Sequence, residues 1–427
     1  MIIVNPKRDS NPRGKASWYP YYAGFSDSFA QNLLGSIGDT PGAVILDPWN
    51  GSGTTCVNAA NLGYVTYGYD LNPVMVIAAK ARQVNILDKP SLTPLAYDII
   101  SKALNSSYRS PKSDPLNAWF RFSTTSRFRH VEKAIQTLLI NSEKYQSLIE
   151  RADYGFVSPI ACFFYTALFR TVRSLLKTFI GSNPTWTKKP KTLREKLRYS
   201  ASDVTDEFMS QVNLMLSVME EDVYGPAALE GKITVNVGSS EKIPLEDGSA
   251  DFILTSPPYC TRIDYAVATA PELAILGYAE TTSFDRLRRG LIGTATVPKT
   301  VPDVSQEWGM TCLSFLERLY EHPSKASKSY YYKNHLQYFQ SLSISIGELS
   351  RVLKTNGQCV LVLQDSFYKE LHNDLSRIAV EMGKSAGLIL DQRVNFPTRQ
   401  TMANVNQAAR IYRDSATVTE SVLCFKK

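Results

Sequence analysis

A hydroxyl and an aromatic ring flank two prolines at the end of an apolar segment, and residues of these types can hold a ligand. Residues 251–255 read DFILT, which predicts a strand buried on both faces, as in a parallel sheet. Ser256, Pro257, Pro258 and Tyr259 follow directly. Each proline fixes φ and lacks an N–H, so the carbonyls of this turn point in set directions. Ligands bind at the carboxyl ends of strands in open α/β sheets, which makes the turn a candidate catalytic loop. On turn chemistry alone, plain architecture is the more frequent role of a Pro-Pro turn.

A glycine-rich turn forms a second constellation after an earlier strand. Residues 44–47 read VILD and residues 48–55 read PWNGSGTT. Gly51 and Gly53 let the backbone approach a ligand closely, and the helix that follows offers free N–H groups at its N-terminus. Asp70 ends the next strand, where a carboxylate can accept both ribose hydroxyls of a nucleoside. The alternatives are a tight turn for the glycines and a helix cap for Asp70.

Alternating strand and helix patterns place both constellations in one sheet. Helices are expected over 54–62 and after Asn72, where Pro73 suits the first helical position. Two successive βα units favour a parallel, doubly wound sheet. A further strand of this sheet is expected after a turn at Asn356 and Gly357, and a hairpin near the C-terminus is expected to complete the sheet. The expected strands cover residues 44–47, 65–70, 233–238, 251–256, 358–365, 387–396 and 420–427.

Composition limits the classes of protein to consider. The 427 residues allow one large domain with insertions or two to three ordinary ones, and 44% hydrophobic residues support a packed core. The net charge of +7 suits a polyanionic partner. Six dispersed cysteines and four histidines indicate no metal site, and free thiols in a reducing cytosol are the simplest interpretation. No signal peptide is expected, because the apolar run at residues 1–4 is too short. No membrane span is expected either, because the apolar region 155–169 is too short and predicts a buried helix.

Two motifs carry a resemblance to a known family. Residues 256–259 resemble motif IV of the DNA amino-methyltransferases, enzymes that methylate N4 of cytosine or N6 of adenine and carry Ser/Asp/Asn-Pro-Pro-aromatic. Residues 47–55 resemble the family's motif I, usually Asp-Pro-Phe-x-Gly-Ser-Gly-Thr-Thr, with Trp49 as the aromatic. Two independent motifs in one chain favour the functional interpretation of the Pro-Pro turn.

Weaker matches extend the resemblance over residues 17–85 and 231–427. Residues 70–73 resemble motif II, and the aromatic segment that ends in Phe25 and Ser26 resembles motif X, which packs against the methionine end of the cofactor. The motif order, with the cofactor half first, differs from that of many family members with Ser-Pro-Pro-Tyr.

The resemblance implies a Rossmann-like α/β fold, with a seven-stranded methyltransferase sheet, a terminal β-hairpin and a large helical insertion. The methyltransferase domain is expected over residues 1–85 and 231–427. The helical insertion, at 86–230, is a candidate DNA-recognition region with apolar-periodic runs at 130–150, 155–180 and 204–222. A second insertion is expected within the catalytic half, at 260–335.

The resemblance also implies S-adenosyl-L-methionine as the cofactor. The family often has Asp after the third strand, near the adenine ring, whereas this chain has Gly238, Ser239 and Ser240, so the adenine contact stays open. The expected cofactor-binding residues are Phe25, Ser26, Asp47, Pro48, Trp49, Gly51, Ser52, Gly53, Thr54, Thr55, Asp70, Leu71 and Ser239.

The implied chemistry is methyl transfer to an exocyclic amine, with Ser256, Pro257, Pro258 and Tyr259 as catalytic residues. The amine is a poor nucleophile because its lone pair is delocalised into the ring. Acceptors at Ser256 and the Pro257 carbonyl would free that lone pair and stabilise the developing positive charge. The methyl group is then displaced in line, with no metal or covalent intermediate required. A base inside a duplex must first be flipped out, and Tyr259 would stack on it; a core aromatic is the alternative.

Basic residues near aromatic ones suit phosphate contact plus base stacking, although charge runs are often only solvated faces. One group lies in segment 182–198 of the helical insertion, with Trp186, and the other in the second insertion. Asp264, Tyr265 and Glu272 could line the base pocket; the alternative roles are helix capping and a solvated helix face. The expected DNA-binding residues are Lys188, Lys189, Lys191, Arg194, Arg288, Arg289, Lys328 and Lys333.

The resulting hypothesis is a site-specific methyltransferase of double-stranded DNA. Ser256 at the first motif position favours N4 of cytosine. The alternatives are N6 of adenine, an RNA base, or a catalytically silent nucleic-acid-binding module. The resemblance further implies a cytoplasmic protein of a bacterium or archaeon, with a cognate restriction endonuclease or another defence-system protein as partner and no metal or membrane.

Overall fold

The computed structural model describes residues 1–7, 11–19, 24–38, 42–140, 153–181, 186–219, 232–260, 263–297, 300–398 and 418–427. Parts of the expected aromatic segment, of segment 182–198 and of the helical runs at 130–150 and 204–222 therefore lie outside the described residues.

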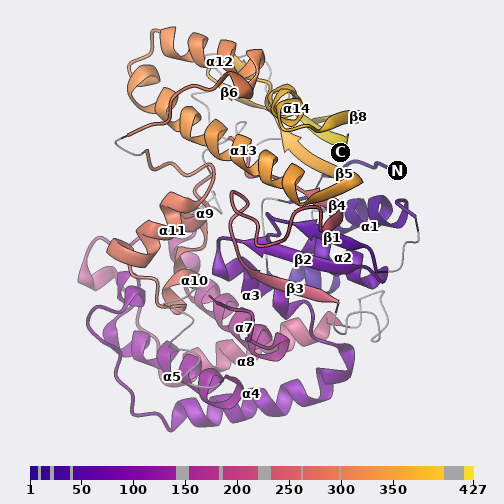
Figure 1. Ribbon diagram of the computed structural model, residues 1–427. Helices are drawn as coiled ribbons and strands as arrows, with labels where there is room; N and C mark the ends of the chain where they lie inside the picture. The colour runs from indigo at the N-terminus through magenta and orange to yellow at the C-terminus, as the bar shows by residue number, and fades with distance from the viewer. Residues whose placement is uncertain are drawn as a thin grey trace.

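A seven-stranded sheet forms the centre of the molecule (Figure 1). Its order is β3-β2-β1-β4-β5-β9-β8. The first five strands along the chain are parallel, β9 runs antiparallel to β5, and β8 runs antiparallel to β9. The Rossmann-like sheet with a terminal hairpin is thus confirmed. Its strands are β1 (Val44–Asp47), β2 (Val65–Asp70), β3 (Ile233–Val237), β4 (Ala250–Thr255), β5 (Leu353–Gln364), β8 (Ile389–Thr398) and β9 (Val418–Lys426).

The strand order reverses between β1 and β4. The chain builds β1, β2 and β3 toward one edge and then returns to place β4 on the other side of β1, with Ile45 opposite Phe252 and Leu46 opposite Ile253. A crevice opens at such a reversal, outside the carboxyl ends of the strands, and open α/β proteins bind ligands there. The glycine turn after β1 and the Pro-Pro turn after β4 both begin at this point.

Helices cover both faces of the sheet. Ile45 packs in one core cluster with Phe29 of α1, whereas its neighbour Leu46 points to the opposite cluster with Leu342 of α13 and Ile378 of α14. This alternation along a buried strand is what a doubly wound sheet requires. The helices next to the sheet are α1 (Asp27–Gly35), α2 (Thr54–Asn61), α3 (Pro73–Ala81), α13 (Tyr332–Val352) and α14 (Leu375–Ser385).

The helical insertion shares a core with the sheet domain. Phe163 and Phe164 of α7 belong to the same buried cluster as Val76 of α3. The buried Lys80 of α3 donates to the carbonyls of Tyr154 and Gly155, at 2.9 and 2.7 Å. The insertion lies below the sheet in Figure 1 and contains α4 (Lys89–Leu104), α5 (Phe122–Leu139), α7 (Pro159–Leu175) and α8 (Ala201–Ser217).

The second insertion packs against both the helical insertion and the sheet domain. Leu273 and Ile275 of α10 join the core of the helical insertion, while Phe315 and Leu316 of α12 pack with α13 and α14. This segment contains α9 (Tyr265–Ala268), α10 (Ala270–Ile275), α11 (Asp285–Gly290) and α12 (Met310–Glu321), and a two-stranded ribbon, β6 (Ser366–Tyr368) and β7 (Leu371–Asn373), follows β5. The remaining short helices are Gly14–Ser17, Ile86–Asp88, Pro115–Ala118, Lys177–Phe179, Leu193–Glu195, Glu280–Phe284, Gln306–Trp308 and Ser327–Tyr331.

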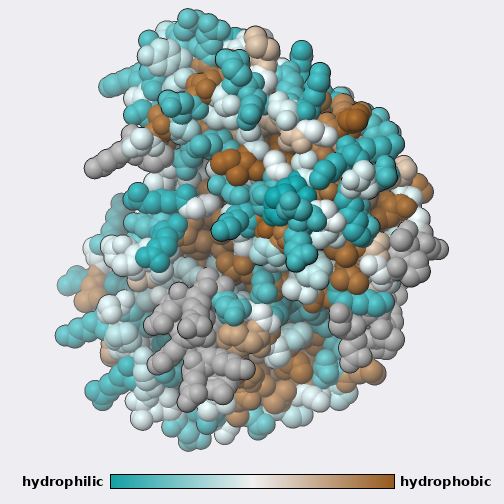
Figure 2. Space-filling model, in the orientation of Figure 1, coloured by the Kyte–Doolittle hydropathy of each residue, from teal (hydrophilic) through white to brown (hydrophobic). Residues whose placement is uncertain are grey.

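Hydrophilic and hydrophobic side chains are both exposed on the face of the molecule shown in Figure 2. In Figure 2 the hydrophobic side chains on the visible face form separate patches between polar ones. No helix within the described ranges is long and apolar enough to cross a membrane. Over the same ranges no group of three or more His, Cys, Asp or Glu side chains could hold a metal ion. All six cysteines are buried and free of disulfides.

Candidate active site

Asp47 joins the two turns at the strand reversal. Its carboxylate accepts hydrogen bonds from the hydroxyls of Thr255, at the end of β4, and Thr55, at the start of α2, at 2.5 and 2.6 Å. It also accepts from the Trp49 N–H at 3.1 Å. Burial raises the pKa of Asp47 to about 6, against the lowering effect of these three donors. The Asp47 carboxylate is therefore occupied by hydrogen bonds from neighbouring protein groups, and these bonds fix the glycine turn relative to the Pro-Pro turn.

The glycine turn has the backbone geometry that its sequence predicts. Gly51 and Gly53 have φ of +49° and +87°, in the left-handed region that favours glycine. A Cβ at Gly53 would lie 2.8 Å from the Cβ of Ala79 on α3, so the turn packs against that helix without room for a side chain. Ser52 and Thr54, on either side of Gly53, line the cavity of the site.

Asp70 ends β2 beside this turn. Its two carboxylate oxygens accept from the N–H groups of Gly51 and Asn72, at 3.0 and 2.8 Å. Burial raises the pKa of Asp70 to about 7, the two N–H bonds lower it, and the charge of Asp47 raises it further. Asp70 therefore holds the backbone at Gly51 and Asn72, and it lines the cavity of the site. The helix cap of α3, the alternative role for Asp70, is provided by Asn72 instead.

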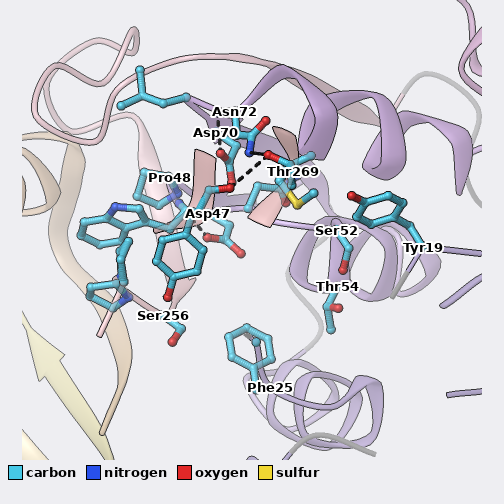
Figure 3. Close-up of a pocket in the computed structure, with 18 of the residues that line it drawn as sticks. Tyr19, Phe25, Asp47, Pro48, Ser52, Thr54, Asp70, Asn72, Ser256 and Thr269 are labelled. Carbon is cyan, nitrogen blue, oxygen red and sulfur yellow. Dashed lines mark hydrogen bonds between the residues drawn. The ribbon is translucent and has the colours of Figure 1, made fainter. Parts of the chain in front are cut away.

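One cavity joins the elements of the site. The N-terminal segment, both turns, the end of β2 and the helices after the Pro-Pro turn all contribute to its wall. Figure 3 shows Phe25, Ser52, Thr54, Asp70 and Ser256 around one space. The expected residues that line the cavity are Phe25, Ser26, Asp47, Pro48, Trp49, Ser52, Thr54, Asp70, Leu71, Ser256, Pro257, Pro258 and Tyr259.

Four expected cofactor residues do not line this cavity. Gly51 and Gly53 shape the turn from behind, and Thr55 is fully buried beneath it. Ser239 lines a neighbouring cavity, whereas Ser240, one residue further on, lines the cavity of the site.

Hydrogen bonds to β5, α13 and β9 hold the Pro-Pro turn in place. The Ser256 hydroxyl donates to the Val362 carbonyl of β5 at 3.0 Å, which leaves its oxygen lone pairs as acceptors. The Tyr338 hydroxyl of α13 donates to the Pro258 carbonyl at 2.8 Å. The Tyr259 hydroxyl donates to Glu420 of β9 at 3.0 Å. Burial raises the pKa of Tyr259 well above its ordinary value, so the phenol stays neutral and remains a donor at neutral pH.

Other wall residues come from segments that sequence reasoning did not connect with the site. Arg173 of α7 reaches the cavity and forms an ion pair with Glu272 of α10, which is completely buried. Tyr19 lines the same region, and its pKa is raised well above the ordinary value by burial and by Glu272. Glu272 is therefore neither a solvated residue nor a free pocket acid. No local signal at Arg173 marks it, because only the packing of α7 against α10 brings it here.

The two other residues considered for the base pocket differ in role. Tyr265 lines the cavity. Asp264 caps α9 by accepting from the Val267 N–H at 3.2 Å, and it pairs with Arg288 at 2.6 Å.

The expected DNA-binding residues form two groups. The first group contains exposed residues, Lys188, Lys189, Lys191 and Arg194. An ion pair joins Lys189 to Glu280, in the short helix that directly precedes α11 with its Arg288 and Arg289. In the second group Lys328 lies 4.8 Å from the ring centre of Tyr320. The half-buried Lys333 is on α13. The Tyr330 hydroxyl donates to the Ala295 carbonyl at 2.8 Å, which ties the second group to the segment after α11.

Comparisons with known proteins give distant relatives. No protein-family model matches the chain. It is 26% identical over 289 residues to the Type II methyltransferase M.BsoBI of Geobacillus stearothermophilus, a match that covers 62% of this chain and 53% of that protein. It is 24% identical over 412 residues to the Type II methyltransferase M.MvaI of Kocuria varians, which covers 90% of this chain and 84% of that one.

A third relative has the same description. The Type II methyltransferase M.AvaI of Nostoc sp. is 21% identical over 408 residues, covering 89% of this chain and 80% of that protein. Among solved structures, a SAM-dependent methyltransferase of Methanosarcina mazei matches with a TM-score of 0.29 and 9% identity, covering 91% of this chain and 94% of that one.

Proposed function

We propose that this chain is an S-adenosylmethionine-dependent DNA methyltransferase that modifies the exocyclic amine of a flipped base. The observation that carries the proposal is the convergence of the glycine turn, Asp70 and the Pro-Pro turn on one cavity at the strand reversal. The distant relatives described as Type II methyltransferases support the same reaction. A restriction endonuclease is accordingly the partner we propose.

The residues around the cavity fit the cofactor. The Asp70 carboxylate faces the cavity and has a raised pKa, so donation by two ribose hydroxyls would stabilise its charged form. Leu71 and Ser240 line the cavity and would form the wall for the adenine ring, in place of the Asp that the family often has. Phe25 and Ser26, just before α1, also line it and would contact the methionine end. When bound, the cofactor supplies the electrophilic methyl group.

The Pro-Pro turn would act on the base amine. Because the Ser256 O–H is directed to the Val362 carbonyl, its oxygen can accept one amine N–H. The Pro257 carbonyl would accept the other. These fixed acceptors stabilise the positive charge that develops on nitrogen, and they need little reorganisation during the reaction. The ring of Tyr259 would stack on the extruded base.

We infer that the DNA lies along the first basic group, Lys188 to Arg194 with Arg288 and Arg289. The ion pair from Lys189 to Glu280 joins the two segments, and the bond from Arg288 to Asp264 connects them to the helix after the Pro-Pro turn. Phosphate contacts there would position the duplex, while base edges would specify the sequence.

N4 of cytosine is the proposed target, on the ground that Ser256 stands at the first motif position. Expression in a bacterial host without DNA methylation, followed by methylation-aware sequencing of its genome, tests both the reaction and the base. We expect modified cytosine at one short sequence. Modified adenine would move the assignment to N6 and keep the mechanism. Cofactor binding without methylation of DNA or RNA would favour the silent binding module instead.

A further inference from the structure

The last strand of the sheet contributes a carboxylate to the Pro-Pro turn. Glu420 lies near the start of β9, opposite Gln364 of β5 and Phe396 of β8. Because β9 runs antiparallel to β5, its beginning meets the edge where the parallel strands end. The Tyr259 hydroxyl donates to the Glu420 carboxylate there, at 3.0 Å. A residue close to the C-terminus thus contacts the aromatic of the turn.

The Glu420 carboxylate is buried, although the pairing of the strands does not require a charged side chain at this position. Glu420 is 9% exposed, and within the described ranges it forms no ion pair. A buried acid without a cation is unfavourable unless hydrogen bonds satisfy it. Burial raises its pKa and the bond from Tyr259 lowers it. An apolar residue at this position would suit a strand whose neighbours Val422 and Leu423 are fully buried.

We propose that Glu420 is a positioning residue that holds the ring of Tyr259 in the orientation that stacks on the flipped base. The inference rests on the proposed function and deepens it. Glu420 acts through Tyr259 and does not touch the base. A tethered hydroxyl fixes a side chain that could otherwise rotate about two torsions, so less conformational freedom is lost when the base enters.

The neighbouring bonds give the same pattern. Ser256 is held from β5 through Val362, which pairs with Val422 of β9, and the Pro258 carbonyl is held by Tyr338 of α13. Ser256 and the carbonyl that precedes Tyr259 are therefore each fixed by a residue distant in sequence. Glu420 supplies this support for the ring.

Four variants test the inference. Tyr259→Phe keeps the ring and removes its hydroxyl, Glu420→Ala removes the acceptor, and Glu420→Gln retains an acceptor oxygen. Asp391→Ala is the matched control, because Asp391 lies on the same hairpin and pairs with Lys426 at the surface, at 2.7 Å. The single-turnover methylation rate is measured on a duplex of the recognition sequence, together with the fluorescence of 2-aminopurine at the target base and the affinity for S-adenosylhomocysteine.

We expect Glu420→Ala and Tyr259→Phe each to lower the single-turnover rate about tenfold to hundredfold, as misplacement of a reacting group does. Base extrusion should weaken in parallel, the cofactor affinity should not change, and Glu420→Gln should recover most of the loss. The double variant Tyr259→Phe/Glu420→Ala should be no slower than either single variant, because both changes remove one interaction.

Two results would overturn the inference while the proposed function stands. One is an active wild-type enzyme whose Glu420→Ala variant methylates and extrudes the base equally well. The other is a double variant in which the two losses multiply. If the Glu420→Ala protein fails to fold, Tyr259→Phe and Glu420→Gln decide the question. Tyr259→Phe must then lower the methylation rate, and Glu420→Gln must retain most of it. A wild-type protein that methylates no nucleic acid overturns the proposed function and this inference together.

Discussion

The affinity for S-adenosylmethionine should rise with pH between 6 and 8, through the ionisation of Asp70. Burial raises the pKa of this carboxyl to about 7 in the cofactor-free protein. Ribose hydroxyls that donate to the carboxylate favour its charged form, so the pKa falls in the complex and binding releases a proton. With a pKa of about 7, about a tenth of Asp70 is ionised at pH 6 and about nine tenths at pH 8, which predicts a roughly tenfold increase in affinity.

Isothermal titration calorimetry with S-adenosylhomocysteine measures this directly. Titrations at pH 6, 7 and 8 give the affinity, and buffers of different ionisation enthalpy at pH 7 give the number of protons released. The α-amino group of the ligand also binds a proton, so its own contribution must be removed. Asp70→Asn serves as the matched control, because its amide cannot ionise and the ligand is the same. Asp70→Ala should weaken binding further while the protein stays folded.

An affinity that changes equally with pH in the wild-type protein and in Asp70→Asn would refute this reasoning. The proton released on binding would then come from the ligand or from another group. Unchanged affinity in Asp70→Ala would mean that Asp70 only caps the turn through Gly51 and Asn72.

Three further predictions concern catalysis, DNA binding and stability. Ser256→Ala should lower the methylation rate about 10²–10³-fold, the typical loss for one preorganised hydrogen-bonding group, with cofactor affinity retained in calorimetry; an equal loss of both would mean a folding defect. Neutralising Lys188, Lys189, Lys191 and Arg194 together should lower the affinity for DNA. The slope of log affinity against log salt concentration should fall by about 0.9 per lost phosphate contact. An unchanged slope would mean that the DNA binds elsewhere. Glu272→Ala leaves Arg173 without its buried partner and should lower the free energy of unfolding, measured in urea, by about 3–5 kcal/mol. Glu280→Ala removes an exposed ion pair and should change that free energy by less than about 0.5 kcal/mol. Equal losses in the two variants would mean that the buried pair does not stabilise the fold.

Local patterns in the sequence were enough to locate the strands and turns that carry the site. The strands at 44–47 and 65–70 have the expected bounds, since turn residues that admit few conformations bound them. Strand β5 begins earlier than the expected residue 358. Asn356 has the left-handed φ of +66° that a turn predicts, yet its N–H donates to the Lys427 carbonyl, and the strand continues through it from Leu353.

The parts of the site that were missed depend on contacts between distant segments. Arg173, Tyr338 and Glu420 lie on two helices and the last strand, and each reaches the cavity or the Pro-Pro turn only after the chain has folded. The spacing of residues along the sequence does not predict such tertiary contacts. An acid at the start of the last apolar strand was the one local signal, because a buried strand rarely carries a carboxylate without a partner.

The central claim is that the Pro-Pro turn methylates an exocyclic amine of DNA. Nucleoside mass spectrometry of duplex DNA, incubated with the purified protein and methyl-labelled S-adenosylmethionine, tests it most directly. We predict labelled N4-methylcytosine in the wild-type reaction and its near absence with Ser256→Ala. Labelled N6-methyladenine alone would contradict the base assignment, and label in RNA but not in DNA would falsify the substrate class.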